Sequence, residues 1–259
     1  MIIKTFLAHD APVIGYLHDD HDRLVAHKTR PAVVICPGGA YRWLSPREGE
    51  PVALQFFAEG YQTFVLEYTV GEGASGLRPL RQLGEALRQL RQNAESLRIQ
   101  PEHIAVLGFS AGGHLAGSLA CLWQREELGL GGDCRPDAAV LCYPVISAGE
   151  FAHRESIETV TGGDAALRGL LSLENQVTPA MPPCFLWHCV GDESVPVENT
   201  LLLTTAMQRA GVSYECHLFA GGAHGVSLCN REVESPTPEA AAWVGLCKAW
   251  LNRTFDFLP

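Results

Sequence analysis

The amino-acid sequence predicts an α/β fold in which helices cover both faces of a mostly parallel central sheet. Short apolar runs typical of buried strands alternate along the chain with longer segments of helical periodicity. Strands that alternate with helices in this way are typical of a parallel sheet covered on both sides. Residues 1–30 are expected to add an antiparallel edge to this sheet.

The predicted strands are apolar runs that end abruptly at turn residues. The run "PAVVICPGG" shows the pattern, because valine and isoleucine give way directly to proline and glycine. The strands are assigned to residues 31–39, 61–68, 103–109, 137–146, 184–190 and 214–219.

The predicted helices lie between and after these strands. The strongest is 77–97, where leucines recur at intervals of three and four residues. The other helices are assigned to residues 49–59, 111–124, 197–210 and 237–252. Ligands of such sheets bind beyond the carboxyl ends of the strands, so functional residues are expected in the loops there.

Length and composition bound the class of protein. The 259 residues are expected to form one domain, 1–259, with residues 147–183 as a small insertion beside the site. A net charge of −10 argues against nucleic acid or an anionic membrane surface as a partner. No run of about 18 apolar residues occurs, so no transmembrane helix is expected. Nine scattered cysteines without a CxxC pair favour reduced thiols and a cytoplasmic location.

The stretch "VLGFSAGGHLAGSLA" places Ser110 between two glycines where a predicted strand meets a predicted helix. Its central residues match G-x-S-x-G, the pattern of a nucleophile elbow. A sharp turn strains the serine backbone, and the residues two positions away must lack side chains to avoid collision. The hydroxyl then projects at a helix N-terminus, where developing negative charge is favoured. An ordinary tight turn fits the same five residues, but the flanking elements favour a catalytic serine.

A nucleophilic serine needs a base, and the base needs an acid that orients it. In this arrangement the serine is followed along the chain by an aspartate or glutamate and then by a histidine, each after a later strand. Asp192 follows one of the later predicted strands, and His224 lies in a glycine-rich loop after the next. Glu193 and Glu198 are weaker candidates for the acid.

The remaining histidines near the predicted strands favour structural roles. The neighbours His188 and Cys189, and likewise Cys216 and His217, could suggest a metal site. Adjacent residues of a strand point to opposite faces, however, so each pair is a poor chelate. No metal or cofactor is therefore expected. His114, in the first turn after the serine, is expected to pack near the site rather than to act in catalysis.

The tetrahedral intermediate of acyl transfer needs two backbone N–H donors, which form an oxyanion hole. Ala111, directly after the serine, is expected to supply one of them. The other is expected from "PGGAY" (37–41), where glycines allow the backbone to approach a substrate closely. The donor there is either Gly39 or Ala40, and the sequence does not choose between them. A simple turn is the alternative interpretation of these glycines.

Through these residues the sequence resembles the α/β-hydrolase fold, in an esterase branch that includes acetyl-xylan-esterase-like and hormone-sensitive-lipase-related proteins. The resemblance implies that Ser110 is the nucleophile, Asp192 the orienting acid and His224 the base. It rests on the stretches "PGGAY", "GFSAGGHLAGSLA", "RPDAAVLCYPVIS", "PPCFLWHCVGDESVPVENT" and "FAGGAHGVSL". Two departures stand out. Pro37 occupies a position where many relatives carry histidine, and "LRPLRQLGEAL" lacks the aspartate that relatives often carry after the proline.

The expected reaction is hydrolysis of a carboxylic ester through an acyl-enzyme, in which His224 deprotonates Ser110 and later activates water. A short insertion favours a soluble short-chain ester, and the resemblance points to an acetyl group on a sugar. Bulky Tyr41, Trp43 and Tyr143 are expected to limit the acyl pocket. A peptidase, formamidase or dienelactone-type hydrolase on the same triad is the alternative. A third hypothesis is a non-catalytic binding module on this fold. The complete Ser-Asp-His order argues against it.

Overall fold

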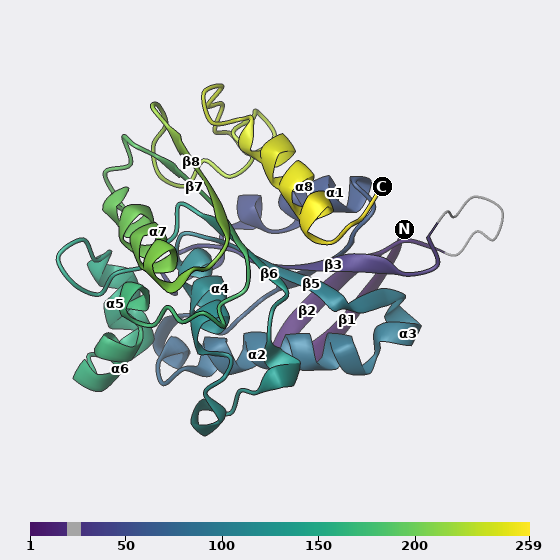
Figure 1. The fold of residues 1–259 in the computed structure, drawn as a ribbon, viewed down its shortest axis with the longest axis horizontal. Coiled ribbons are helices and arrows are strands. Elements are labelled where there is room, and N and C mark those ends of the chain that lie inside the picture. Colours follow the sequence, from purple (N-terminus) through teal and green to yellow (C-terminus); the bar gives the residue numbers. More distant parts are fainter. Residues whose placement is uncertain (20–26) are drawn as a thin grey trace.

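The computed structural model describes residues 1–19 and 27–259 of the chain. Within these ranges, an eight-stranded sheet runs through the molecule and helices lie against both of its faces (Figure 1). The strands are ordered β1-β2-β4-β3-β5-β6-β7-β8 across the sheet. Strands β3 to β8 are parallel to one another, whereas β1 and β2 form an antiparallel hairpin whose strand β2 pairs antiparallel with β4. This architecture confirms the predicted fold class.

The elements follow one another in the alternating order that the sequence predicts. The strands are β1 (Ile2–Ala8), β2 (Ala11–Leu17), β3 (Arg30–Cys36), β4 (Gln62–Leu66), β5 (Ile99–Phe109), β6 (Ala138–Cys142), β7 (Cys184–Cys189) and β8 (Tyr214–Phe219). The helices are α1 (Glu50–Ala58), α2 (Arg78–Gln92), α3 (Ala94–Leu97), α4 (Ala111–Leu122), α5 (Arg154–Thr161), α6 (Ala165–Leu170), α7 (Glu198–Ala210) and α8 (Trp243–Thr254).

Several predicted elements have different bounds in the structure, and three of these differences follow from the local geometry. The predicted strand at 137–146 ends at Cys142, because Tyr143 takes a positive φ of 36° and turns the chain away. The predicted helix at 77–97 is interrupted at Asn93, whose side-chain amide donates to the Gln89 carbonyl. The last helix starts at Trp243, later than predicted, since residues 237–242 form turns.

Apolar side chains pack on both faces of the sheet. On one face α2, α4 and α7 bury leucines such as Leu83, Leu119 and Leu203. On the other face α1 and α8 bury large aromatic residues, among them Phe56 and Trp243. No helix among the described residues has the length and apolar character needed to cross a membrane.

The parallel strands share one direction, so their carboxyl ends meet at one edge of the sheet. The loops that follow β3, β5, β7 and β8 therefore come together, although they are far apart in sequence. Crevices beyond these ends are the usual ligand sites of open α/β sheets.

Candidate active site

Ser110 stands on a sharp, strained turn between β5 and α4. Its backbone adopts φ 54° and ψ −118°, a conformation that costs energy for any residue with a side chain. The flanking glycines make this turn possible. A Cβ at Gly112 would overlap the carbonyl oxygen of Cys36, and one at Gly108 would overlap the carbonyl oxygen of Gly112. The backbone geometry is that of the predicted nucleophile elbow.

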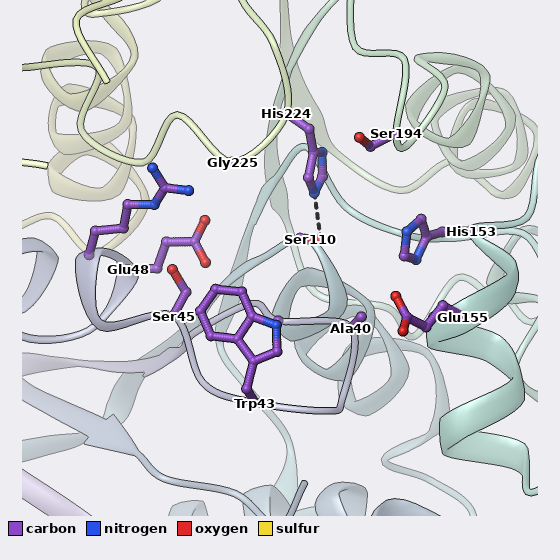
Figure 2. Close-up of a pocket in the computed structure, with 12 residues that line it drawn as sticks. Ala40, Trp43, Ser45, Glu48, Ser110, His153, Glu155, Ser194, His224 and Gly225 are labelled. Atoms are coloured by element: carbon purple, nitrogen blue, oxygen red, sulfur yellow. Dashed lines mark hydrogen bonds between the residues drawn. The ribbon is translucent and has the colours of Figure 1, made fainter. Parts of the chain in front are cut away.

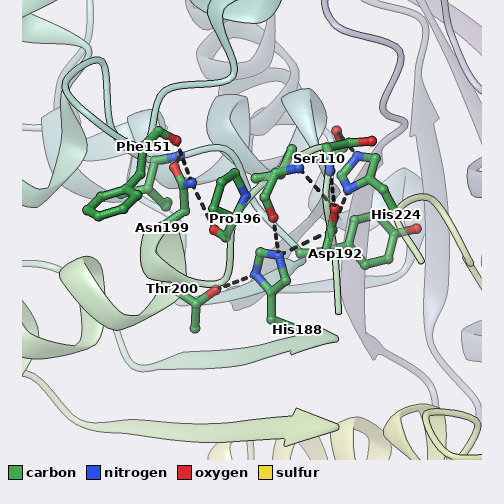
Figure 3. A network of polar contacts seen from close by, with 12 residues as sticks. Ser110, Phe151, His188, Asp192, Pro196, Asn199, Thr200 and His224 are labelled. Atoms are coloured by element: carbon green, nitrogen blue, oxygen red, sulfur yellow. Dashed lines mark hydrogen bonds and ion pairs between the residues drawn. The ribbon is translucent and has the colours of Figure 1, made fainter. Parts of the chain in front are cut away.

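The structure brings the three predicted site residues into one chain of hydrogen bonds (Figure 3). His224 Nε2 lies 2.7 Å from the Ser110 hydroxyl oxygen, and His224 Nδ1 lies 2.6 Å from Asp192 Oδ2. An ionised carboxylate can only accept, so Nδ1–H donates to Asp192 and Nε2 is left to accept the serine proton. This is the arrangement in which a histidine can act as general base toward a serine hydroxyl.

Asp192 is held by four hydrogen-bond donors. Its Oδ1 accepts from the backbone amides of Ser194 and Val195, at 3.0 and 2.9 Å, while its Oδ2 faces His224 and, at 3.3 Å, His188 Nε2. Burial opposes ionisation, but the hydrogen bonds from His188 and His224 outweigh it and hold the pKa of Asp192 below its usual value. Of the other candidates for the acid, Glu193 is exposed to solvent.

His188 is a contact of the acid that the sequence analysis did not assign. The side chain is fully buried, with Nδ1 2.8 Å from the Thr200 hydroxyl and Nε2 2.9 Å from the Val195 carbonyl (Figure 3). Nε2 must therefore carry the proton that faces both Val195 and Asp192. A histidine inside a buried parallel strand needs polar partners, and that requirement was the signal in the sequence.

The first turn after β3 approaches the serine from the other side. We call residues 37–45 the oxyanion loop. The Gly38 amide donates to Glu48, whereas those of Arg42 and Trp43 donate to the Gly39 carbonyl. Gly39 and Ala40 both line the pocket, and Ala111 begins α4 directly after the serine. Their role as oxyanion donors stays a prediction.

A pocket of about 260 Å³ opens above Ser110 (Figure 2). The indole of Trp43 forms one side of it, and His153 and Glu155 of the α5 region lie across from the indole. Eight of the twelve lining residues have polar or charged side chains. The lining residues are Gly39, Ala40, Trp43, Ser45, Arg47, Glu48, Ser110, His153, Glu155, Ser194, His224 and Gly225.

The three aromatic residues expected to wall the pocket do not share that role. Trp43 is 54% exposed and lines the pocket, but Tyr41 and Tyr143 are buried. The Tyr41 hydroxyl lies 2.8 Å from His114 Nδ1, which supports the predicted packing role of this histidine. Burial lowers the pKa of His114 to about 4, so its ring is neutral and can accept from the tyrosine.

Among the described residues, no group of three or more His, Cys, Asp or Glu side chains could hold a metal ion. His188 is instead engaged with Thr200, Val195 and Asp192, and His217 bonds Glu215 at 3.0 Å. The protein groups of the site are a hydroxyl, an oriented imidazole, a buried carboxylate and candidate amide donors.

Two family models match the chain. The model described as BD-FAE matches residues 16–139, and the model described as the alpha/beta hydrolase fold matches residues 79–228. The second match covers more than half of the chain and includes Ser110, Asp192 and His224. The chain belongs to the α/β-hydrolase fold family.

Solved structures of similar proteins extend over nearly all of this α/β hydrolase. An acetyl ester-xyloside bifunctional hydrolase from Caldicellulosiruptor lactoaceticus is 36% identical, with a TM-score of 0.84 over 96% of this chain and 89% of that one. The carboxylesterase Cest-2923 from Lactobacillus plantarum WCFS1 is 29% identical, with a TM-score of 0.89 over 100% of both chains.

A curated relative is considerably longer than this α/β hydrolase. Endo-1,4-beta-xylanase B of Butyrivibrio fibrisolvens is 34% identical over 231 residues, which make up 85% of this chain and 35% of the relative. The chain therefore spans about a third of the length of that relative.

Proposed function

We propose that the protein is a serine carboxylic-ester hydrolase that works through an acyl-enzyme. The observation that carries this proposal is the hydrogen-bonded chain Asp192–His224–Ser110 at the bottom of an open pocket. Relatives with esterase names and the fold family support it. We extend the proposal to one domain, 1–259, in which residues 147–183 with α5 and α6 form an insertion beside the pocket.

The catalytic cycle follows from these groups. His224 Nε2 removes the hydroxyl proton as Ser110 Oγ attacks the ester carbonyl, and the carbonyl oxygen takes negative charge. We assign the amides of Ala111 and of Gly39 or Ala40 as the donors to that oxygen. The imidazolium then returns the proton to the leaving alcohol, which leaves an acyl group on the serine. Water enters and attacks the acyl carbon while His224 accepts a proton from it. The imidazolium then returns this proton to Ser110 Oγ as the second tetrahedral intermediate collapses to the acid and the free serine.

The groups that line the pocket support the proposal that the substrate is an ester of a polar alcohol, such as an acetylated sugar. Hydroxyl, carboxylate, imidazole and guanidinium groups line the pocket, and they suit the hydrogen-bonding groups of a polyhydroxylated alcohol. Arg42 and Glu155 add an ion pair at 3.3 Å beside the pocket. Burial and the neighbouring His224 lower the pKa of His153, so its ring faces the pocket uncharged. The name of the Caldicellulosiruptor relative agrees with this substrate class.

Turnover of acetyl esters against amides tests the reaction class. We expect hydrolysis of acetylated glycosides to exceed hydrolysis of aminoacyl amides and formyl amides by orders of magnitude in kcat/KM. A preference for an amide would favour the alternatives, a peptidase or a formamidase. A chain that neither turns over any of these substrates nor reacts with a fluorophosphonate would be a non-catalytic binding module.

Short acyl chains are expected to react fastest. The pocket has a volume of about 260 Å³, and eight of its twelve lining residues have polar or charged side chains, so a long alkyl chain would find few apolar partners there. One methylene is worth about 1–3 kcal/mol in a pocket that discriminates by size, so the loss should accumulate with each added carbon. The values of kcat/KM for p-nitrophenyl esters should fall steadily from acetate to octanoate. A maximum at octanoate would contradict the short-chain assignment.

Trp43 is expected to select for sugar esters over esters of small aliphatic alcohols. Its exposed indole face can pack against a pyranose ring, a contact that ethanol is too small to make. Trp43→Ala should raise KM for an acetylated methyl xyloside by about 10-fold, the size of one lost aromatic contact. Ethyl acetate should be affected much less, because its alcohol does not reach the indole.

Trp43→Phe keeps an aromatic face and should restore most of the sugar-ester activity. Ile3→Ala is a matched control, since Ile3 is 58% exposed on the edge strand β1, away from the pocket. If Trp43→Ala weakened activity on the xyloside and on ethyl acetate equally, the indole would not select between alcohols. Its role would then be to keep the conformation of its own loop.

A cytoplasmic location and the absence of nucleic-acid and membrane partners remain part of this proposal. The nine cysteines, all within the described residues, are free, and eight of them are buried. Buried reduced thiols are typical of proteins kept in a reducing compartment. The small-molecule ester is the partner that the pocket supports.

A further inference from the structure

Glu48 is a buried carboxylate beside the serine for which the catalytic cycle has no use. It is 3% exposed and ends a short 3₁₀ turn, Pro46–Glu48, just after the oxyanion loop. Both of its oxygens accept hydrogen bonds. The Gly38 amide donates to Oε2 at 2.8 Å, and the Tyr143 hydroxyl donates to Oε1 at 2.6 Å.

The first of these bonds fixes the oxyanion loop close to the serine. Gly38 packs so tightly that an added Cβ would lie 2.8 Å from Glu48 Oε2, 2.9 Å from the Phe109 carbonyl and 3.1 Å from Ser110 Cβ. The residues directly after Gly38 are the two candidate oxyanion donors. Glu48 therefore orients the peptide from which the donor amides follow.

The second bond leads to the loop that carries the base. We call residues 220–229 the histidine loop. The hydroxyl oxygen of Tyr143 accepts from the Ser227 amide at 2.9 Å. The Tyr143 ring packs edge to face with the His224 ring, and their centroids are 5.1 Å apart. Burial, and after it the charge of Glu48, raises the pKa of Tyr143 well above its usual value. The hydroxyl thus stays protonated and can donate to Glu48 while it accepts from Ser227.

A further bond joins the histidine loop to the 3₁₀ turn that carries Glu48. The Ser227 hydroxyl donates to the Arg47 carbonyl at 2.5 Å, and the Ser227 carbonyl accepts from Trp243 Nε1 at 2.9 Å. The oxyanion loop follows β3 and the histidine loop follows β8, and three strands separate β3 from β8 in the sheet. Polar contacts through Glu48 and Tyr143 bridge that distance.

We infer that Glu48 is a positioning residue, which acts through Tyr143 to hold the oxyanion loop and the histidine loop in one fixed geometry. The inference rests on the proposed esterase function. Attack by the serine needs the base and the oxyanion donors in place at the same moment, and small misplacements cost large factors in rate. A buried network whose members are all satisfied provides such rigidity.

Glu48→Ala and Glu48→Gln separate positioning from charge. Alanine leaves the Gly38 amide and the Tyr143 hydroxyl without their acceptor, so kcat should fall by about 100-fold, as when an oxyanion donor is lost, with KM within a few-fold of wild type. Glutamine keeps the shape, accepts from Gly38 through its oxygen and donates to the tyrosine oxygen through its amide. It should restore kcat to within about 10-fold of wild type.

Tyr143→Phe tests the other half of the link. Phenylalanine keeps the ring packing against His224 but loses both bonds of the hydroxyl, so kcat should fall by about 10-fold. The double variant Glu48→Ala/Tyr143→Phe should be little slower than Glu48→Ala alone, because both changes break the same chain.

A boronic acid that forms a tetrahedral adduct on the serine supplies a readout that fold stability does not move. Its affinity should fall in parallel with kcat in Glu48→Ala, because the adduct uses the same oxyanion donors. Gln62→Ala is the matched control. Gln62 is also a buried polar residue with two hydrogen bonds, to the His18 amide and the Leu97 carbonyl, but it lies at the start of β4, opposite the site. Gln62→Ala should lower the Tm of the protein and leave its kcat near that of the wild type.

Three results would overturn the inference: kcat near wild type in Glu48→Ala, no rescue by Glu48→Gln, or boronate affinity unchanged while kcat falls. Each of these would leave the esterase function in place as long as the wild-type chain hydrolyses acetyl esters. A wild-type chain that is folded but neither hydrolyses them nor binds the boronate would overturn the proposed function, and this inference with it.

Discussion

Alanine in place of Ser110 is expected to lower kcat on acetyl esters by on the order of 10⁵–10⁶-fold and to abolish labelling by a fluorophosphonate. The hydroxyl is the group that His224 Nε2 contacts at 2.7 Å, and it sits on a turn whose strained backbone serves to present it. The fold should survive, because alanine removes one oxygen from a residue that packs at the surface of the pocket. Thermal unfolding checks this point alongside the kinetics.

The expected loss is large but finite. The remaining oxyanion donors and the binding pocket still accelerate attack by water over the uncatalysed reaction. Ser118→Ala is the matched control, since Ser118 is a buried serine of the same helix, α4, whose hydroxyl donates only to the His114 carbonyl. It should keep full activity and full labelling. Labelling that persists in Ser110→Ala would place the nucleophile elsewhere in the chain.

The serine could be predicted from sequence because its constraints are local. The turn needs small residues two positions to either side, a strand before it and a helix after it, and all of these are visible within 15 letters. Asp192 and His224 could be predicted for a different reason. Parallel strands deliver their following loops to one edge, so chain order alone brings distant loops together.

The roles of three other residues could not be predicted from the sequence in this way. These residues are Glu48, Tyr143 and His188. Their roles depend on partners that are remote in sequence, such as Tyr143 on Glu48, and no spacing rule connects the two. Tyr143 was expected to wall the acyl pocket, but the chain turns at this residue and buries its ring beneath His224. The periodicity of apolar residues reports burial and not the direction of a turn. For the same reason it extended the strand at 137–146 past Cys142.

The choice between Gly39 and Ala40 as oxyanion donor also escapes the sequence. In the structure, three amides close to these two residues already donate to other acceptors. The Gly38 amide donates to Glu48, and the Arg42 and Trp43 amides donate to the Gly39 carbonyl. Three consecutive residues, 39–41, have positive φ. Strain of this kind in a loop beside a nucleophile is typical of a functional site.

Asparagine in place of Asp192 is expected to lower kcat by on the order of 10⁴-fold with the fold intact. The surroundings of this side chain dictate which way the amide must lie. Oδ1 accepts from the Ser194 and Val195 amides, so the oxygen of asparagine must stay there. The NH₂ group then faces His224 Nδ1, where the carboxylate accepted at 2.6 Å. Two N–H groups, that of the new amide and that of His224 Nδ1, would then face each other without an acceptor between them.

The imidazole can relieve that conflict only by moving its proton. With Nδ1 accepting from the amide, the hydrogen shifts to Nε2, and Nε2 can no longer accept from the Ser110 hydroxyl at 2.7 Å. The other residues that line the pocket are unchanged, so KM should change little, and the loss should appear in kcat. Glu193→Gln is the matched control one residue along, because its side chain is exposed and Asp192 already occupies the position beside His224. If Glu193→Gln lost activity while Asp192→Asn stayed near wild type, the acid of the triad would be Glu193, and the loop after β7 would have to take another course in the working enzyme.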